Sequence, residues 1–114
     1  MFDALSALSL YRQLEALDNN LSKIRGDDVT NQFLAAYTNQ ASFNHILEQV
    51  TEQCADSPEY LKSFSHIKPA KVPKGADRSV YPGFLAKVQM LKQAVGAFIE
   101  LAMSSEQKTQ IGFR

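Results

Sequence analysis

The stretch DVTNQFLAAYTNQASFNHILEQVTEQC, residues 28–54, decides the fold. Residues on one line through it recur at alternating steps of four and three, which is the 3.5-residue period of a helix packed along a seam. We therefore expect one long helix over residues 28–54, with the other helices packed against it. The seam consists of Val29, Phe33, Ala36, Gln40, Phe43, Leu47, Val50 and Cys54.

Gln40 is the only polar residue on this seam. A single polar residue at such a position can fix the register or the oligomeric state of a helical assembly. Alternatively, the neighbouring Ala36 and Ala41 mark a thin part of the bundle where the amide reaches water. Under the first interpretation, Gln40→Leu should stabilise the fold but give a mixture of oligomeric states.

Two further stretches show the same stepping and predict helices over residues 4–25 and 83–104. Gly26 follows the first of them directly, as is common at a helix C-terminus, and either Asp27 or Asp28 can cap the next helix. The connection is so short that the first two helices must form an antiparallel hairpin. Gly96 lies in the middle of the last helix and predicts that another helix approaches closely there. The two seams are Leu10, Leu14, Leu17, Leu21 and Ile24, and Phe84, Val88, Leu91, Val95, Phe98 and Ala102.

Between the second and last long helices, the sequence predicts a short helix over residues 58–65 and then a long loop. Pro58 suits the first position of a helix. Residues 66–82 contain Pro69, Pro73 and Pro82 together with Gly75, so we expect no regular helix there up to Pro82. Scattered apolar residues in this loop, such as Ile67 and Val72, are expected to pin it to the bundle.

The chain of 114 residues suits one all-α domain, which we place at residues 1–105, with a C-terminal tail at 106–114. The three seams predict a coiled-coil-like antiparallel bundle. No secretory signal and no apolar run long enough to cross a membrane is evident. Because the chain has a single cysteine, it fits a reducing compartment, and we expect a cytoplasmic protein.

Residue types that carry catalysis or bind metals are sparse. His45, His66 and Cys54 match no zinc signature, and His45 and Cys54 lie about 13 Å apart along a helix and on different faces. Cys54 is better interpreted as a small core residue at the end of the seam. We therefore expect no enzyme activity, no metal and no cofactor.

The charge distribution is uneven although the net charge is zero. Residues 1–59 carry nine acidic and three basic residues, and residues 60–114 show the reverse. Basic residues on a proline-containing loop can follow a phosphate backbone, so the loop is a candidate anion-binding site. In the alternative interpretation they balance the acidic ends of the first two helices. The candidate residues are Lys68, Lys71, Lys74 and Arg78.

A second apolar line runs beside the seam of residues 28–54, through Leu34, Tyr37, Ala41 and Ile46. Its large residues, Leu34–Tyr37–Ile46, are our candidate partner-binding surface. Leu85, Ile99 and Met103 add further apolar surface on the last helix. Because three helices need less apolar surface than this, the sequence favours a protein partner and self-association into a homodimer. The predicted function is a helical protein–protein interaction module: an adaptor, a chaperone or a small subunit. The alternative is a nucleic-acid-associated protein that binds phosphates through the basic loop 62–78.

Overall fold

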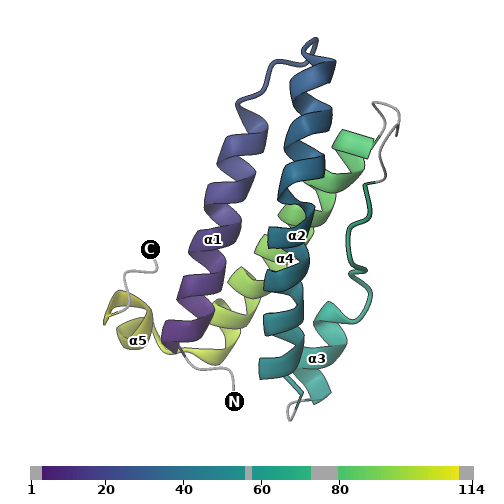
Figure 1. Ribbon diagram of the computed structural model, residues 1–114. Helices are drawn as coiled ribbons and strands as arrows, with labels where there is room; N and C mark the ends of the chain where they lie inside the picture. Colours follow the sequence, from purple (N-terminus) through teal and green to yellow (C-terminus); the bar gives the residue numbers. More distant parts are fainter. Residues whose placement is uncertain (1–3, 56–57, 73–79, 111–114) are drawn as a thin grey trace.

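The computed structural model describes residues 4–55, 58–72 and 80–110. Over these residues the chain is all-α, as predicted, and three long helices pack against one another (Figure 1). Figure 1 shows α4 crossing behind the hairpin of α1 and α2. The helices are α1 Ala4–Ser22, α2 Val29–Gln53, α3 Pro58–Phe64, α4 Val80–Ala102 and α5 Ser105–Gln110.

The turn between α1 and α2 is closed by side chains, which accounts for the tight hairpin. The Asp28 carboxylate accepts a hydrogen bond from the backbone N–H of Asn31 at 3.2 Å, so Asp28 is the N-cap, as predicted. The amide of Gln32 donates to the backbone carbonyl of Arg25 across the turn at 3.0 Å. These bonds satisfy groups at the end of one helix and the start of the next.

Helix α1 ends at Ser22, three residues before the predicted end. The seam continues to Ile24, but the carbonyl of Leu21 accepts a hydrogen bond from the Ile24 N–H, three residues on, instead of continuing the α-helical ladder. The buried hydroxyl of Tyr81 donates to the same carbonyl. A contact from another helix therefore helps to fix this boundary, and a sequence pattern does not contain it.

Helix α4 begins at Val80, three residues before the predicted start at 83, so the prediction of no regular helix up to Pro82 is wrong at this end of the loop. Pro82 is the third helical residue. The first N–H groups of a helix have no acceptor within it, so a proline there removes no hydrogen bond. The early start carries Tyr81 to the end of α1 and adds it to the core.

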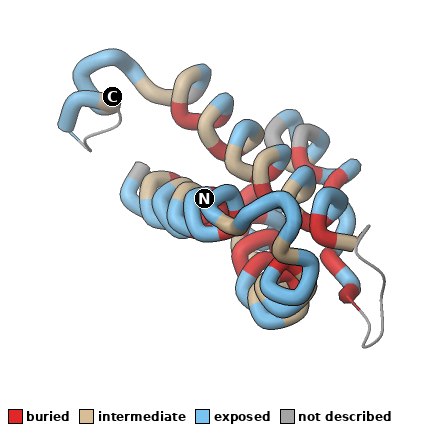
Figure 2. The backbone as a smooth tube through the Cα atoms, turned by 90° about the horizontal axis from the view of Figure 1, so that it is seen from above, coloured by how far each residue is buried: buried red, intermediate tan, exposed pale blue. Residues whose placement is uncertain are grey.

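The core lies where α1, α2 and α4 meet, and Figure 2 shows buried residues gathered between the helices with exposed residues outside. Phe43 of α2 and Phe84 of α4 meet edge to face, with ring centroids 5.8 Å apart. Cys54 is fully buried, as predicted for the end of the seam. Val29, which opens the same seam, is 39% exposed.

Gly96 of α4 faces α1, as its position in mid-helix predicted. A Cβ atom at Gly96 would lie 3.4 Å from the ring of Tyr11. That distance is a van der Waals contact, so the Tyr11 ring of α1 packs against Gly96 and leaves room for one methyl group.

The short helix α5 begins at Ser105, the last residue of the predicted domain, and continues into the predicted tail, turning the chain away after α4. Its start is a capping box: the Ser104 hydroxyl accepts from the Gln107 N–H, and the Gln107 side chain accepts from the Ser104 N–H. Lys108 then forms an ion pair with Glu100 of α4 at 2.9 Å. Apolar periodicity misses this helix because α5 has no buried residue.

Among the residues described, no helix combines the length and the apolar character needed to cross a membrane.

Candidate interaction surface

Residues 67–72 form a non-helical segment that α2 holds through side-chain amides. The Asn44 amide accepts a hydrogen bond from the N–H of Ala70 at 2.7 Å and donates to the Ala70 carbonyl at 2.9 Å. One helical turn away, the Gln40 amide makes the same two bonds with Val72, at 2.8 Å and 3.2 Å. Each amide thus satisfies both backbone groups of one residue.

The spacing of these residues explains why both pairs form. Four residues along a helix advance about 6 Å, and two residues along a stretched chain advance about 6.6 Å. Gln40 and Asn44 are four apart, whereas Ala70 and Val72 are two apart and run in the opposite direction. Neither interpretation of Gln40 from sequence anticipated this role: its amide anchors the segment.

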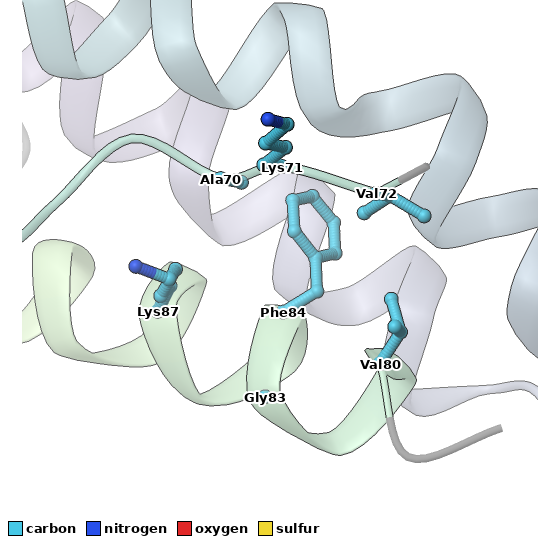
Figure 3. Close-up of a pocket in the computed structure, with 7 residues that line it drawn as sticks. All are labelled: Ala70, Lys71, Val72, Val80, Gly83, Phe84 and Lys87. Carbon is cyan, nitrogen blue, oxygen red and sulfur yellow. The ribbon is translucent and has the colours of Figure 1, made fainter. Parts of the chain in front are cut away.

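Apolar contacts complete the attachment of the segment. Ile67, Ala70 and Val72 are buried against the bundle, as predicted for the apolar residues of this loop. A hollow of about 180 Å³ remains between the segment and α4. Figure 3 shows Phe84 projecting from α4 toward the segment in this hollow, with Lys71 and Lys87 beside it.

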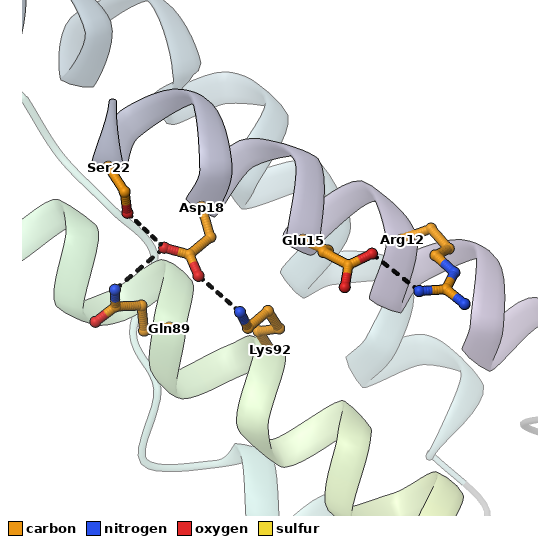
Figure 4. A network of polar contacts seen from close by, with 6 residues as sticks. All are labelled: Arg12, Glu15, Asp18, Ser22, Gln89 and Lys92. Atoms are coloured by element: carbon orange, nitrogen blue, oxygen red, sulfur yellow. Dashed lines mark hydrogen bonds and ion pairs between the residues drawn. The ribbon is translucent and has the colours of Figure 1, made fainter. Parts of the chain in front are cut away.

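A second polar cluster joins α1 to α4 inside the bundle (Figure 4). Asp18 of α1 forms an ion pair with Lys92 of α4 at 2.6 Å, and the same carboxylate accepts hydrogen bonds from Gln89 and Ser22, both at 3.1 Å. Asp18 is only 8% exposed, and its carboxylate accepts hydrogen bonds from these three donors. A buried charge is tolerated when it is paired and hydrogen-bonded in this way.

The pairing shifts the proton affinities of the groups around it. The hydrogen bond from Lys92 lowers the pKa of Asp18 below its ordinary value of 3.8, against the opposing effect of burial. The hydrogen bond to Asp18 raises the pKa of Lys92 above 10.5. Burial raises the pKa of the Tyr81 hydroxyl above 10.0, and the negative charge of Asp18 adds to the effect. All three shifts favour the form present at neutral pH.

The predicted partner-binding line Leu34–Tyr37–Ile46 does not form one surface. Leu34 is 50% exposed, and Tyr37 is half-buried with its ring stacked on Phe33 at 5.9 Å, but Ile46 is 3% exposed and belongs to the core. In the predicted line, Ile46 follows Ala41 by five residues. Five residues rotate the side-chain direction by one full turn plus about 140°, so the two side chains point to different sides of the helix. Ile46 therefore faces the core instead of extending the line.

The extra apolar residues on the last helix are also used inside the molecule. Ile99 is fully buried, and Leu85 and Met103 are partly buried against the core. Their side of α4 faces α1, the same side on which Lys92 pairs with Asp18. These three residues therefore leave no separate apolar surface.

The candidate anion-binding residues fall into two groups. Lys68 and Lys71 are exposed on the segment that α2 holds, whereas Lys74 and Arg78 lie outside the described residues. The Lys68 backbone carbonyl accepts a hydrogen bond from Lys87 at 2.9 Å. Within the part of the chain that the structure describes, no ion pair joins Lys68 or Lys71 to an acidic side chain.

The described residues contain no group of three or more His, Cys, Asp or Glu side chains that could hold a metal ion. His45 is exposed on α2, and the fully buried Cys54 lies at the end of the same helix.

The outward side of α4 is the most unusual surface among the described residues. Lys87, Lys92 and Glu100, the three charged residues of α4, are partly buried, and each is bonded to a residue outside α4. Beyond its first turn, where Pro82 and Gly83 are exposed, the residues of α4 that face outward follow one another at helical spacing and are uncharged. We call this set the α4 outer face: Ala86, Met90, Gln93, Ala94, Ala97 and Leu101.

Large apolar side chains are exposed on the α4 outer face. Met90 is 42% and Leu101 is 83% exposed. The helices α1 and α2 differ, because charged residues such as Arg12 and Glu48 are exposed on them. An exposed helix face that lacks charge and carries large apolar side chains is typical of a surface that a partner covers. Sequence reasoning missed this face because it followed the inner seam; the spacing of Met90, Ala97 and Leu101 was the available signal.

The fold and this surface define an all-α bundle with one uncharged outer helix face. Comparison of the chain with protein-family models, with curated proteins and with solved structures gives no match.

Proposed function

We propose that this chain is a non-catalytic protein–protein interaction module that binds another protein chain through the α4 outer face. The observation that carries the proposal is the absence of charge on the exposed side of α4, combined with the exposure of Met90 and Leu101. Single exposed apolar residues are ordinary on protein surfaces, but apolar residues that are contiguous along a helix are typical of interaction sites.

The physical basis is the removal of apolar surface from water, at about 25 cal/mol for each Å² buried. Desolvation of the α4 outer face removes no charge from water, because its six residues are all uncharged. The charged side chains of α4 are already bonded within the chain, so a partner need not break an ion pair to cover the face. Leu34 on α2 is a smaller, separate apolar position.

In-cell photo-cross-linking tests this proposal. A benzophenone amino acid at position 90 should give discrete cross-linked products, because Met90 lies on the α4 outer face. The matched control places the same group at Ala16, which is exposed on α1. If both positions give the same weak, diffuse pattern, the α4 outer face is not an interaction site and the proposal fails.

A second candidate function is nucleic-acid binding, in which Lys68 and Lys71 contact the phosphate groups. The observation in its favour is that both lysines are exposed on an anchored segment and form no ion pair with a described acidic residue. Two phosphate contacts predict that log Kd for a single-stranded oligonucleotide changes with log salt at a slope of magnitude about 1.4.

A double variant, Lys68→Ala with Lys71→Ala, should remove most of that salt dependence. Lys23→Ala is the control, since Lys23 is exposed at the end of α1, away from the segment. Salt-insensitive or absent binding by the unmodified chain would dispose of this candidate.

A further inference from the structure

Large and small side chains are arranged along the α4 outer face so that two antiparallel copies of the face would fit together. In chain order the face reads Ala86, Met90, Gln93, Ala94, Ala97 and Leu101. Ala86 and Leu101 lie equally far from the midpoint between residues 93 and 94, and so do Met90 and Ala97. An antiparallel copy of the same helix would therefore place each large apolar side chain opposite an alanine.

We propose that the occupant of the α4 outer face is a second copy of this chain, bound antiparallel across a two-fold axis near Gln93. This inference rests on the proposed function and specifies its partner. A two-fold interface uses the same patch on both copies and must be complementary to itself. The size order of α4 meets that condition: Leu101 packs beside Ala86 of the second copy, and Met90 beside Ala97.

The polar and charged groups are consistent with this pairing. None of the six residues carries a charge, so two copies bring no like charges together on this face. Gln93 lies next to the axis, and its amide can both donate and accept, so the two Gln93 side chains can bond to each other. One polar pair at the centre also favours this register over a shifted one.

The size of the contact predicts how tight the dimer is. The stripe from Ala86 to Leu101 is about 24 Å long, on a helix about 10 Å wide. Such a strip buries less than the roughly 800 Å² per partner that is usual in stable complexes. We therefore expect a reversible dimer whose population increases with protein concentration.

Cysteine cross-linking tests the register. Gln93→Cys should form a disulfide with its own copy, because the two residues lie beside the axis. Met90→Cys should cross-link to Ala97→Cys when the two variants are mixed, but not to itself. Two copies of residue 90 are offset by about 10 Å along the helices, which exceeds the Cα–Cα distance of a disulfide.

Two controls are available within the chain. The unmodified protein keeps only the fully buried Cys54 and should not cross-link. Ala16→Cys on the exposed side of α1 reports random collision. The proposal is overturned if Gln93→Cys cross-links no faster than Ala16→Cys, or if Met90→Cys cross-links to itself as readily as to Ala97→Cys.

Failure of this inference can be distinguished from failure of the proposed function. A monomer at every concentration in sedimentation, together with a photo-cross-linked product at position 90 of some mass other than twice the chain, overturns the second copy alone. No specific product at position 90 overturns both. A product of twice the chain mass supports both.

Discussion

Gln40 shows how one polar side chain can have a role that the local pattern does not contain. From sequence, its place on a seam allowed a role in register or contact with water. In the structure its amide bonds to the N–H and carbonyl of Val72, 32 residues away. The seam was predictable from local spacing, whereas this partner was not, because contacts distant in sequence leave no periodic trace.

We expect Gln40→Leu to destabilise the fold by about 1–3 kcal/mol, because it leaves both backbone groups of the buried Val72 without partners. This reverses the expectation from sequence that leucine would stabilise the fold. Urea unfolding measures the change. Asn39→Leu is the matched control, since the Asn39 amide donates to Ala35 in its own helix. Equal effects of the two variants would show that anchoring contributes nothing.

The Asp18–Lys92 pair predicts a stability that falls at both ends of the pH scale. Asp18 has a lowered pKa in the folded chain, so its contribution is present above pH 3.8 and is lost as pH falls below it. Lys92 and Tyr81 have raised pKa values, so their contributions are present below about pH 10 and are lost above it. Thermal unfolding across pH measures both limbs.

In Asp18→Asn, stability should fall less steeply as pH decreases. The loss of stability at high pH that comes from the buried Tyr81 should remain. Glu15→Gln is the control, because Glu15 forms only a partly exposed pair with Arg12. An unchanged acid limb in Asp18→Asn would mean that other carboxylates govern acid unfolding.

At the scale of the helices, the sequence predicts the existence of the four longest elements and misplaces their ends. Periodicity extends α1 to Ile24 because it records which residues face the core, not where hydrogen bonding stops. Pro82 was interpreted as a barrier, although the first turn of a helix accepts proline. α5 was missed because its signals are a capping box and the Lys108–Glu100 pair.

Gly96→Ala tests the packing of the Tyr11 ring of α1 against α4. Alanine is favoured over glycine in a helix by up to about 1 kcal/mol, and a Cβ would meet the Tyr11 ring at 3.4 Å, which is ordinary contact. We therefore expect the variant to be more stable by up to about 1 kcal/mol in denaturant unfolding. Gly96→Leu should destabilise the fold, because the longer side chain must displace Tyr11. Tolerance of leucine would contradict the packing of the Tyr11 ring against Gly96.

The molecule as a whole is elongated and thin. Its principal extents are 44 × 26 × 15 Å, and its radius of gyration is 15.0 Å, compared with about 13 Å for a compact domain of this length. A thin bundle leaves a larger share of each helix exposed. The fold class was predictable from three seams, whereas the α4 outer face was predictable only in part. The spacing of its apolar residues was a signal, but the partners of the three charged residues of α4 do not follow from spacing.

Met90→Lys tests the α4 outer face at the scale of the whole molecule. Because Met90 is 42% exposed, we expect the unfolding free energy of the isolated monomer to change by no more than about 0.5 kcal/mol. Self-association in sedimentation should be lost, because two lysines would be desolvated at the contact. Gln13→Lys on the exposed side of α1 should leave association unchanged. Loss of folding in Met90→Lys would show that Met90 belongs to the core.

The amide anchoring of residues 67–72 has a consequence for hydrogen exchange. A non-helical surface segment ordinarily exchanges its backbone hydrogens quickly with water. The N–H groups of Ala70 and Val72 are instead bonded to side chains of α2, so they should exchange slowly, at rates set by release of the segment from α2. The N–H of the exposed Lys71 between them should exchange much faster. Slow and fast exchange would then alternate along the segment, as they do along the edge strand of a β-sheet, although the described residues contain no strand.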